Sequence, residues 1–134
     1  MATKYIVDTH ALIWNFEGNS LLGKSAKAAI NDPNSELILP TIALAEAMFI
    51  VEKGRCSLTS VDDLIADVQA DRIINVFPLT RGMLVESATL TAIPEIHDRL
   101  IVAAGVYLQN LGETVEILTK DNEIALSNIL TVTW

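Results

Sequence analysis

Four carboxylates of this sequence stand beside or within apolar stretches: Asp8, Glu46, Asp98 and Asp121. Asp8 directly follows the apolar run at 5–7, and Glu46 is an acid among Ala, Leu, Met and Phe residues. Buried acids without cationic partners are unfavourable, and several that converge repel one another. A divalent cation removes that repulsion, and a site of oxygen ligands selects Mg²⁺ or Mn²⁺. Ions held in this way activate water and stabilise both oxygens of a phosphodiester displacement.

The elements that must position these acids alternate between short apolar runs and amphipathic stretches. Strands are predicted at about residues 5–7, 37–39, 73–77, 115–118 and 130–132. Helices are predicted at about 9–16, 24–31, 41–53, from Ser60 onward, at 80–90 and 98–110, and briefly from Asp121. Strands separated by helices imply an α/β fold with a mostly parallel sheet and helices on both of its faces. The 134 residues fit one domain.

The acids are expected at one end of this sheet. In an open parallel sheet, ligands bind beyond the carboxyl ends of the strands. Asp8 follows the first strand, Asp121 follows the fourth, and Asp98 is expected to open the long apolar helix. Each aspartate could instead be a helix N-cap, a role that Asp favours, and Glu46 could border an exposed helix face. The combination of all four favours a metal site.

Composition narrows the possible functions. The net charge of −8 argues against nucleic-acid binding, although ligating carboxylates account for part of it. One cysteine permits neither an internal disulfide nor a cysteine metal cluster. The start of the sequence lacks a signal-peptide pattern, and no apolar run reaches the roughly 18 residues that cross a bilayer, so we expect a cytoplasmic protein. The basic candidates for phosphate contacts are Lys24, Lys27, Lys53, Arg55, Arg81 and Arg99.

Four short motifs resemble those of PIN-domain proteins, especially the VapC-type toxins of bacterial toxin–antitoxin pairs. The motifs are residues 6–14 (IVDTHALIW), 41–46 (TIALAE), 96–104 (IHDRLIVAA) and 118–121 (LTKD). The resemblance covers the whole chain and implies one PIN-like domain over residues 1–134. This domain would be a three-layer α/β/α structure around a short sheet of about five strands. The resemblance also implies an endoribonuclease dependent on Mg²⁺ or Mn²⁺, often a homodimer, that a small antitoxin inhibits.

The same resemblance assigns roles to individual residues. The metal ligands and catalytic acids would be Asp8, Glu46, Asp98 and Asp121. The side chains expected to orient water or contact substrate around them are Thr9, Arg99, Thr119 and Asn122. Arg99 is expected to pair with a carboxylate or, alternatively, to contact phosphate. The second motif departs from the family pattern, because Ala43 and Ala45 stand near Glu46 and leave only Thr41 as a hydroxyl.

Two other functions stay open at this point. A haloacid dehalogenase-like phosphohydrolase also has an Asp after its first strand, but it needs a second Asp where this chain has His10. A non-catalytic PIN-like or receiver-like binding module would agree with the acidic composition, with Lys120 as a weak candidate for the receiver lysine. The apolar helical faces at 43–51 and 84–90 offer more surface than one core is expected to bury, which predicts a homodimer.

Overall fold

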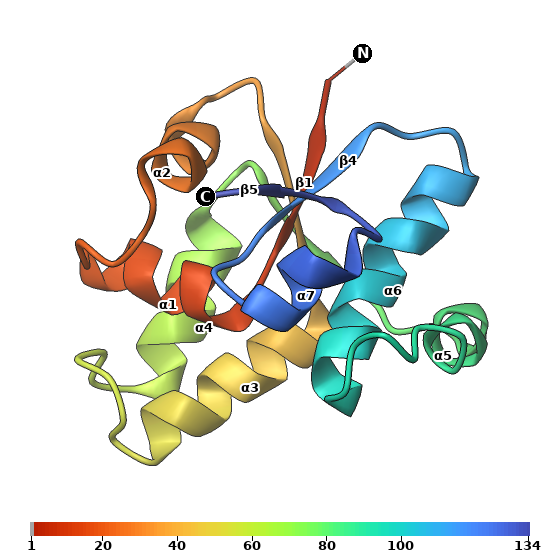
Figure 1. Ribbon diagram of the computed structural model, residues 1–134. Coiled ribbons are helices and arrows are strands. Elements are labelled where there is room, and N and C mark those ends of the chain that lie inside the picture. Colours follow the sequence, from red (N-terminus) through yellow and green to blue (C-terminus); the bar gives the residue numbers. More distant parts are fainter. Residues whose placement is uncertain (1) are drawn as a thin grey trace.

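The computed structural model describes residues 2–134, so that residue 1 of the predicted domain lies outside the description. These residues form five parallel strands in the spatial order β3-β2-β1-β4-β5 (Figure 1). The strands are β1 (Lys4–Val7), β2 (Glu36–Pro40), β3 (Ile74–Phe77), β4 (Val115–Leu118) and β5 (Thr131–Thr133). The register places Ile6 of the central strand opposite Ile38 and Ile117. Residues that follow β1 and β4 therefore emerge side by side.

Within the same residues, seven helices join the strands: α1 (Thr9–Glu17), α2 (Lys24–Asn31), α3 (Thr41–Glu52), α4 (Val61–Ala70), α5 (Arg81–Ser87), α6 (Ile96–Asn110) and α7 (Asn122–Ser127). Figure 1 shows α1, α2 and α4 on one side of the sheet and α5 and α6 on the other. The predicted element order and the three-layer α/β/α arrangement are confirmed. No helix in the described part of the chain is long and apolar enough to cross a membrane.

Two predicted helix boundaries are wrong. The helix expected to open at Asp98 begins at Ile96, because the side chain of Glu95 accepts a hydrogen bond from the backbone N–H of Asp98 and caps the helix two residues earlier. The helix expected to reach residue 90 ends at Ser87. The backbone N–H of Leu90 there bonds to the carbonyl of Ser87, three residues back, so the chain tightens into turns.

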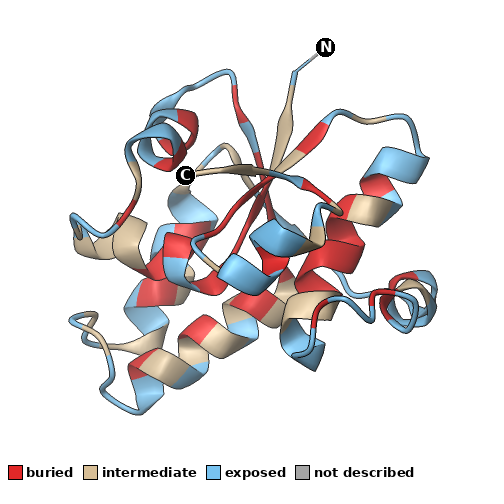
Figure 2. Ribbon diagram, in the orientation of Figure 1, coloured by how far each residue is buried: buried red, intermediate tan, exposed pale blue. Residues whose placement is uncertain are grey.

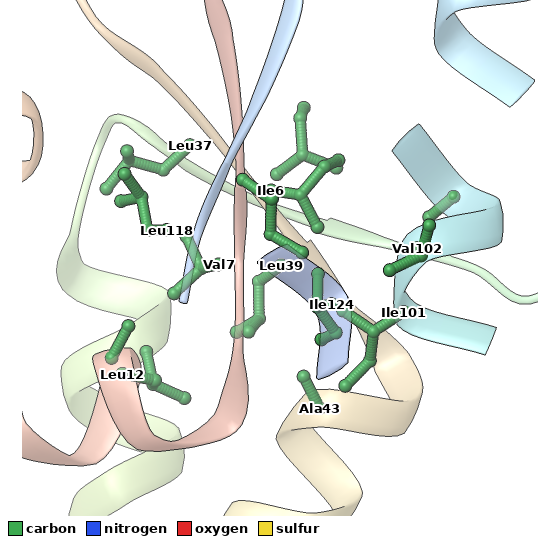
Figure 3. Packing of buried hydrophobic residues seen from close by; sticks show 14 of the residues in the cluster. Ile6, Val7, Leu12, Leu37, Leu39, Ala43, Ile101, Val102, Leu118 and Ile124 are labelled. Carbon is green, nitrogen blue, oxygen red and sulfur yellow. The ribbon is translucent and has the colours of Figure 1, made fainter. Parts of the chain in front are cut away.

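The core lies on both faces of the sheet, as Figure 2 shows by its buried central strands. Successive residues of β1, Ile6 and Val7, are both buried, which is typical of a parallel sheet covered on both faces. Figure 3 shows Ile6 on the side of the sheet that faces Ile101 of α6 and Ile124 of α7, and Val7 on the other side, toward Leu12 of α1. This packing fixes the two strands whose carboxyl ends carry the site.

Candidate active site

Asp8 follows the central strand directly and is held by two hydrogen-bond donors. Its Oδ1 accepts from the backbone N–H of Thr9 at 2.7 Å, and its Oδ2 accepts from the hydroxyl of Thr119 at 2.6 Å. The first bond makes Asp8 the N-cap of α1, the alternative role that the sequence had left open. The residue is only 8% exposed, so its carboxyl group has one well-defined position.

Two threonine hydroxyls connect the other acids to this position. The Thr119 hydroxyl that donates to Asp8 also accepts from the backbone N–H of Asp121 at 3.1 Å. The Thr9 hydroxyl donates to Oε1 of Glu46 at 3.0 Å, which ties α1 to α3. Thr119 therefore links Asp8 to the backbone of Asp121 through its hydroxyl, and Thr9 links Asp8 to Glu46 through its backbone N–H and its hydroxyl. Both threonines, which were predicted around the acids, therefore contact them directly; their roles in orienting water or substrate stay a prediction.

Asp98 enters the site from the first turn of α6. The capping residue Glu95 accepts from the Asp98 backbone N–H at 3.0 Å through Oε2 and contacts Nδ1 of His97 at 2.7 Å through Oε1. The same His97 nitrogen lies 3.9 Å from Oε2 of Glu46. Glu95 was not among the predicted site residues. The only sequence signal for its capping role is that a proline and an acid directly precede the helix.

The electrostatics show that the acids act on one another. Burial is the main cause that raises the pKa of Asp98 to about 7, and the negative charges of Asp8 and Asp121 add to it. Burial also raises the pKa of Asp8, with a smaller contribution from Asp121. The pKa of Glu46 is raised mainly by burial, although the Thr9 hydrogen bond opposes the shift. Burial and the repulsion between neighbouring acids thus disfavour the charged forms of Asp8, Glu46 and Asp98.

A pocket of about 350 Å³ opens over this cluster. Its lining residues are Asp8, Thr9, His10, Trp14, Glu46, Ile50, Asp98, Lys120 and Asp121. All four predicted acids therefore meet at one cavity. Within the described part of the chain, Lys120 is the one Lys or Arg in this lining, and it had not been counted among the basic candidates. An adjacent hollow of about 490 Å³ shares Glu46 and Ile50 and adds Arg55.

Comparison with known protein families shows to which of them the chain belongs. The PIN domain family model matches residues 5–127, a range that contains all four acids. The chain belongs to the PIN domain family. No curated protein matches it by sequence.

Solved structures share the fold of this PIN domain at low sequence identity. VapC20 of Mycobacterium tuberculosis, described as a sarcin–ricin loop cleaving toxin, is similar with a TM-score of 0.68 and 14% identity, over 98% of this chain and 99% of its own. VapBC2 of Rickettsia felis, bound to a DNA fragment from its promoter, gives 0.65 and 13%, over 96% of each chain. At such identities the similarity establishes the fold.

Two of the residues predicted around the site lie apart from the pocket of the PIN domain. Arg99 donates through Nε to the backbone carbonyl of Ile93, and within residues 2–134 it forms no ion pair. The expected pairing of Arg99 with a carboxylate is therefore not observed, because the turn before α6 supplies a closer acceptor. Asn122 is the exposed first residue of α7, and neither residue lines the pocket.

The donor chemistry of the PIN domain fits a hard divalent cation. Carboxylate oxygens are the ligands that Mg²⁺ and Mn²⁺ prefer, and the mutual repulsion of the cluster is what such a cation would relieve. Within residues 2–134, no three His, Cys, Asp or Glu side chains stand close enough together to hold one ion as they are placed. Mg²⁺ commonly binds through one or two carboxylates and completes its coordination with water, a mode that the acids of this pocket would fit.

Proposed function

We propose that this PIN domain is a metal-dependent endoribonuclease and the toxin of a type II toxin–antitoxin pair. The observation that supports the catalytic part most strongly is the meeting of Asp8, Glu46, Asp98 and Asp121 at one pocket. Family membership and the toxin described among the structural neighbours support RNA as the substrate. The haloacid dehalogenase alternative loses its basis, because the chain belongs to a different family and lacks the second Asp.

In this proposal each side chain has a defined task. A bound Mg²⁺ or Mn²⁺ would supply an activated water and stabilise negative charge on the attacking and leaving oxygens. Asp8 provides the fixed ligand, since Thr9 and Thr119 hold both of its oxygens. Asp98, Glu46 and Asp121 complete the set of acids. Lys120, at the edge of the pocket, attracts the RNA phosphates toward these carboxylates.

Cleavage of a single-stranded RNA by the purified protein tests the proposal. We expect cleavage with Mg²⁺ or Mn²⁺ and none with excess EDTA. Asp8→Asn should lower the cleavage rate by more than the roughly 10- to 100-fold that is typical when a residue hydrogen-bonded to a metal ligand is replaced. Asp67→Asn is the matched control, because Asp67 is an exposed acid of α4 outside the pocket. Equal cleavage by Asp8→Asn would refute the catalytic assignment. Absence of cleavage by the unaltered protein would favour a non-catalytic binding module.

The proposal includes partners and a location. A small antitoxin is supported by the VapBC2 neighbour. A cytoplasmic location is part of the same proposal, because RNA would be its substrate. A homodimer is supported by the apolar surface of α5, where Leu84 is 51% and Val85 is 65% exposed. Such adjacent apolar residues on one short helix mark an interaction surface.

A further inference from the structure

One side of the acidic pocket is aromatic. Trp14 of α1 lines the pocket together with His10, while part of its side chain packs against the hydrophobic core. The ring centroid of Trp14 lies 5.3 Å from that of His10 and 5.9 Å from that of Trp134, which meets it edge-on. The indole is therefore anchored by its neighbours and half-buried, with its remaining surface on the same cavity as the four acids.

An exposed cation stands over this indole. The Nζ of Lys120 lies 5.7 Å from the centroid of the Trp14 ring. Lys120 is exposed and lies between Thr119 and Asp121, which both take part in the acid cluster. A cation–π contact at an exposed site is weak, so the long side chain can leave the ring and pair with a phosphate. When the Lys120 side chain leaves, the face of the Trp14 ring that it covered becomes free.

We propose that the Trp14 indole is a stacking site for one base of single-stranded RNA, and that Lys120 binds a neighbouring phosphate. This inference rests on the proposed ribonuclease function, because it places the stacked nucleotide in the pocket that would cut the chain. An aromatic platform beside a cation is the chemistry by which proteins hold unpaired nucleotides, with little preference for sequence.

The inference also resolves a conflict between the charge of the protein and its substrate. A net charge of −8 repels a polyanion at long range, and Lys120 alone supplies positive charge to the pocket lining within the described residues. Stacking of a base on an indole does not depend on net charge. It supplies affinity where a basic surface is lacking. It also favours unpaired bases, which can be splayed out, and disfavours bases held in a duplex.

Fluorescence can observe the stacking directly. The sequence has two tryptophans, so Trp134→Phe leaves Trp14 as the single indole, and Asp98→Asn in the same protein prevents cleavage. We expect an oligouridine to quench the Trp14 emission in the presence of Mg²⁺. An abasic oligonucleotide of equal length retains the phosphates but not the bases, so it should bind roughly 5- to 150-fold more weakly and leave the emission unchanged.

Cleavage kinetics provide the second measurement. In the otherwise unaltered enzyme, Trp14→Phe keeps an aromatic ring and should retain most of the RNA affinity, whereas Trp14→Leu should raise KM by roughly 5- to 150-fold.

Lys120→Gln should reduce the slope of log Kd against log salt by about 0.7, the value for one phosphate of a single strand. Arg72→Gln, at an exposed cation outside the pocket lining, is the control and should leave this slope unchanged.

The outcomes separate the two proposals. If the protein cleaves RNA but the oligouridine does not quench Trp14, and folded Trp14→Leu keeps its KM, stacking is refuted while the ribonuclease stands. If the oligouridine quenches Trp14 and the abasic oligonucleotide does not, but no RNA is cleaved, stacking stands and the catalytic function is refuted. If there is neither quenching nor cleavage, both are wrong.

Discussion

Asp98 carries a charge that the folded protein disfavours, so its removal should stabilise the chain when no metal is bound. Its pKa rises from an ordinary 3.8 to about 7, because burial and the neighbouring acids Asp8 and Asp121 oppose ionisation. The folded state therefore holds this proton more tightly than the unfolded state. The free energy of unfolding should fall as the pH rises from about 4 to about 7, and it should stay reduced above that range.

The size of the effect follows from the shift. A rise from 3.8 to about 7 corresponds to about 4 kcal/mol, at about 1.36 kcal/mol per pKa unit. Asp98 is only partly buried, and water and salt screen such charges, which reduces this figure to about half. The N-terminal end of the α6 dipole favours the charge by roughly 0.3–1 kcal/mol. Asp98→Asn should therefore gain about 1–2 kcal/mol at pH 8, or roughly 3–8 °C in Tm.

Urea and thermal unfolding in EDTA, at pH 5 and pH 8, measure this difference. Asp98→Asn should be more stable than the unaltered protein at pH 8, and the gap should narrow at pH 5. Asp67→Asn, an exposed acid of α4, should stay within about 0.5 kcal/mol of the unaltered protein at both values. Saturating Mg²⁺ should stabilise the unaltered protein more than Asp98→Asn, since binding to the native state raises its stability. If Asp98→Asn gains no stability at pH 8, burial and repulsion at Asp98 do not destabilise the folded protein.

Four further substitutions test the packing and the assembly. Thr119→Val removes the hydroxyl that donates to Asp8, so urea unfolding should show a loss of about 1–3 kcal/mol, and an unchanged midpoint would contradict that role. Gly105→Ala places a methyl group 2.5 Å from a leucine side chain and should lower stability by about 1–3 kcal/mol. Gly82→Ala leaves the added methyl group 3.8 Å from the nearest atom and should raise stability by up to about 1 kcal/mol. If Gly105→Ala were the more stable of the two variants, the close packing of α6 would be refuted. Light scattering should show a dimer that Leu84→Glu converts to monomer, whereas a monomeric unaltered protein at micromolar concentration would refute the dimer.

The order of strands and helices was predictable because each element depends mainly on residues that are neighbours in the sequence. Short apolar runs bounded by polar residues indicate strands, and amphipathic stretches indicate helices, without knowledge of contacts. The start of α6 was mistaken for a related reason. Both Glu95 and Asp98 can cap a helix, and Asp is the more common cap, so sequence preference favoured the residue that the structure places inside the first turn.

The four acids could be named from the sequence, but the contacts that give the cluster its properties could not. Asp8 and Thr119 are 111 residues apart, and they meet because β4 lies beside β1 in the sheet. Pairing of strands distant in the chain is decided by the packing of the whole core, so no local pattern indicates it. The same is true of Trp14 and Lys120, which the sequence had left without a role in substrate binding.

The sequence by itself determined the types of residue available for chemistry, the order of the elements and the family to which the motifs belong. Tertiary structure alone decided that Thr9 and Thr119 would fix the acids, that the pKa of Asp98 would rise to about 7, and that Arg99 would bond to a backbone carbonyl. The physical reason is that these properties depend on distance and burial. Distances between remote residues and the exclusion of water from a carboxylate come into being only when the chain has folded around its core.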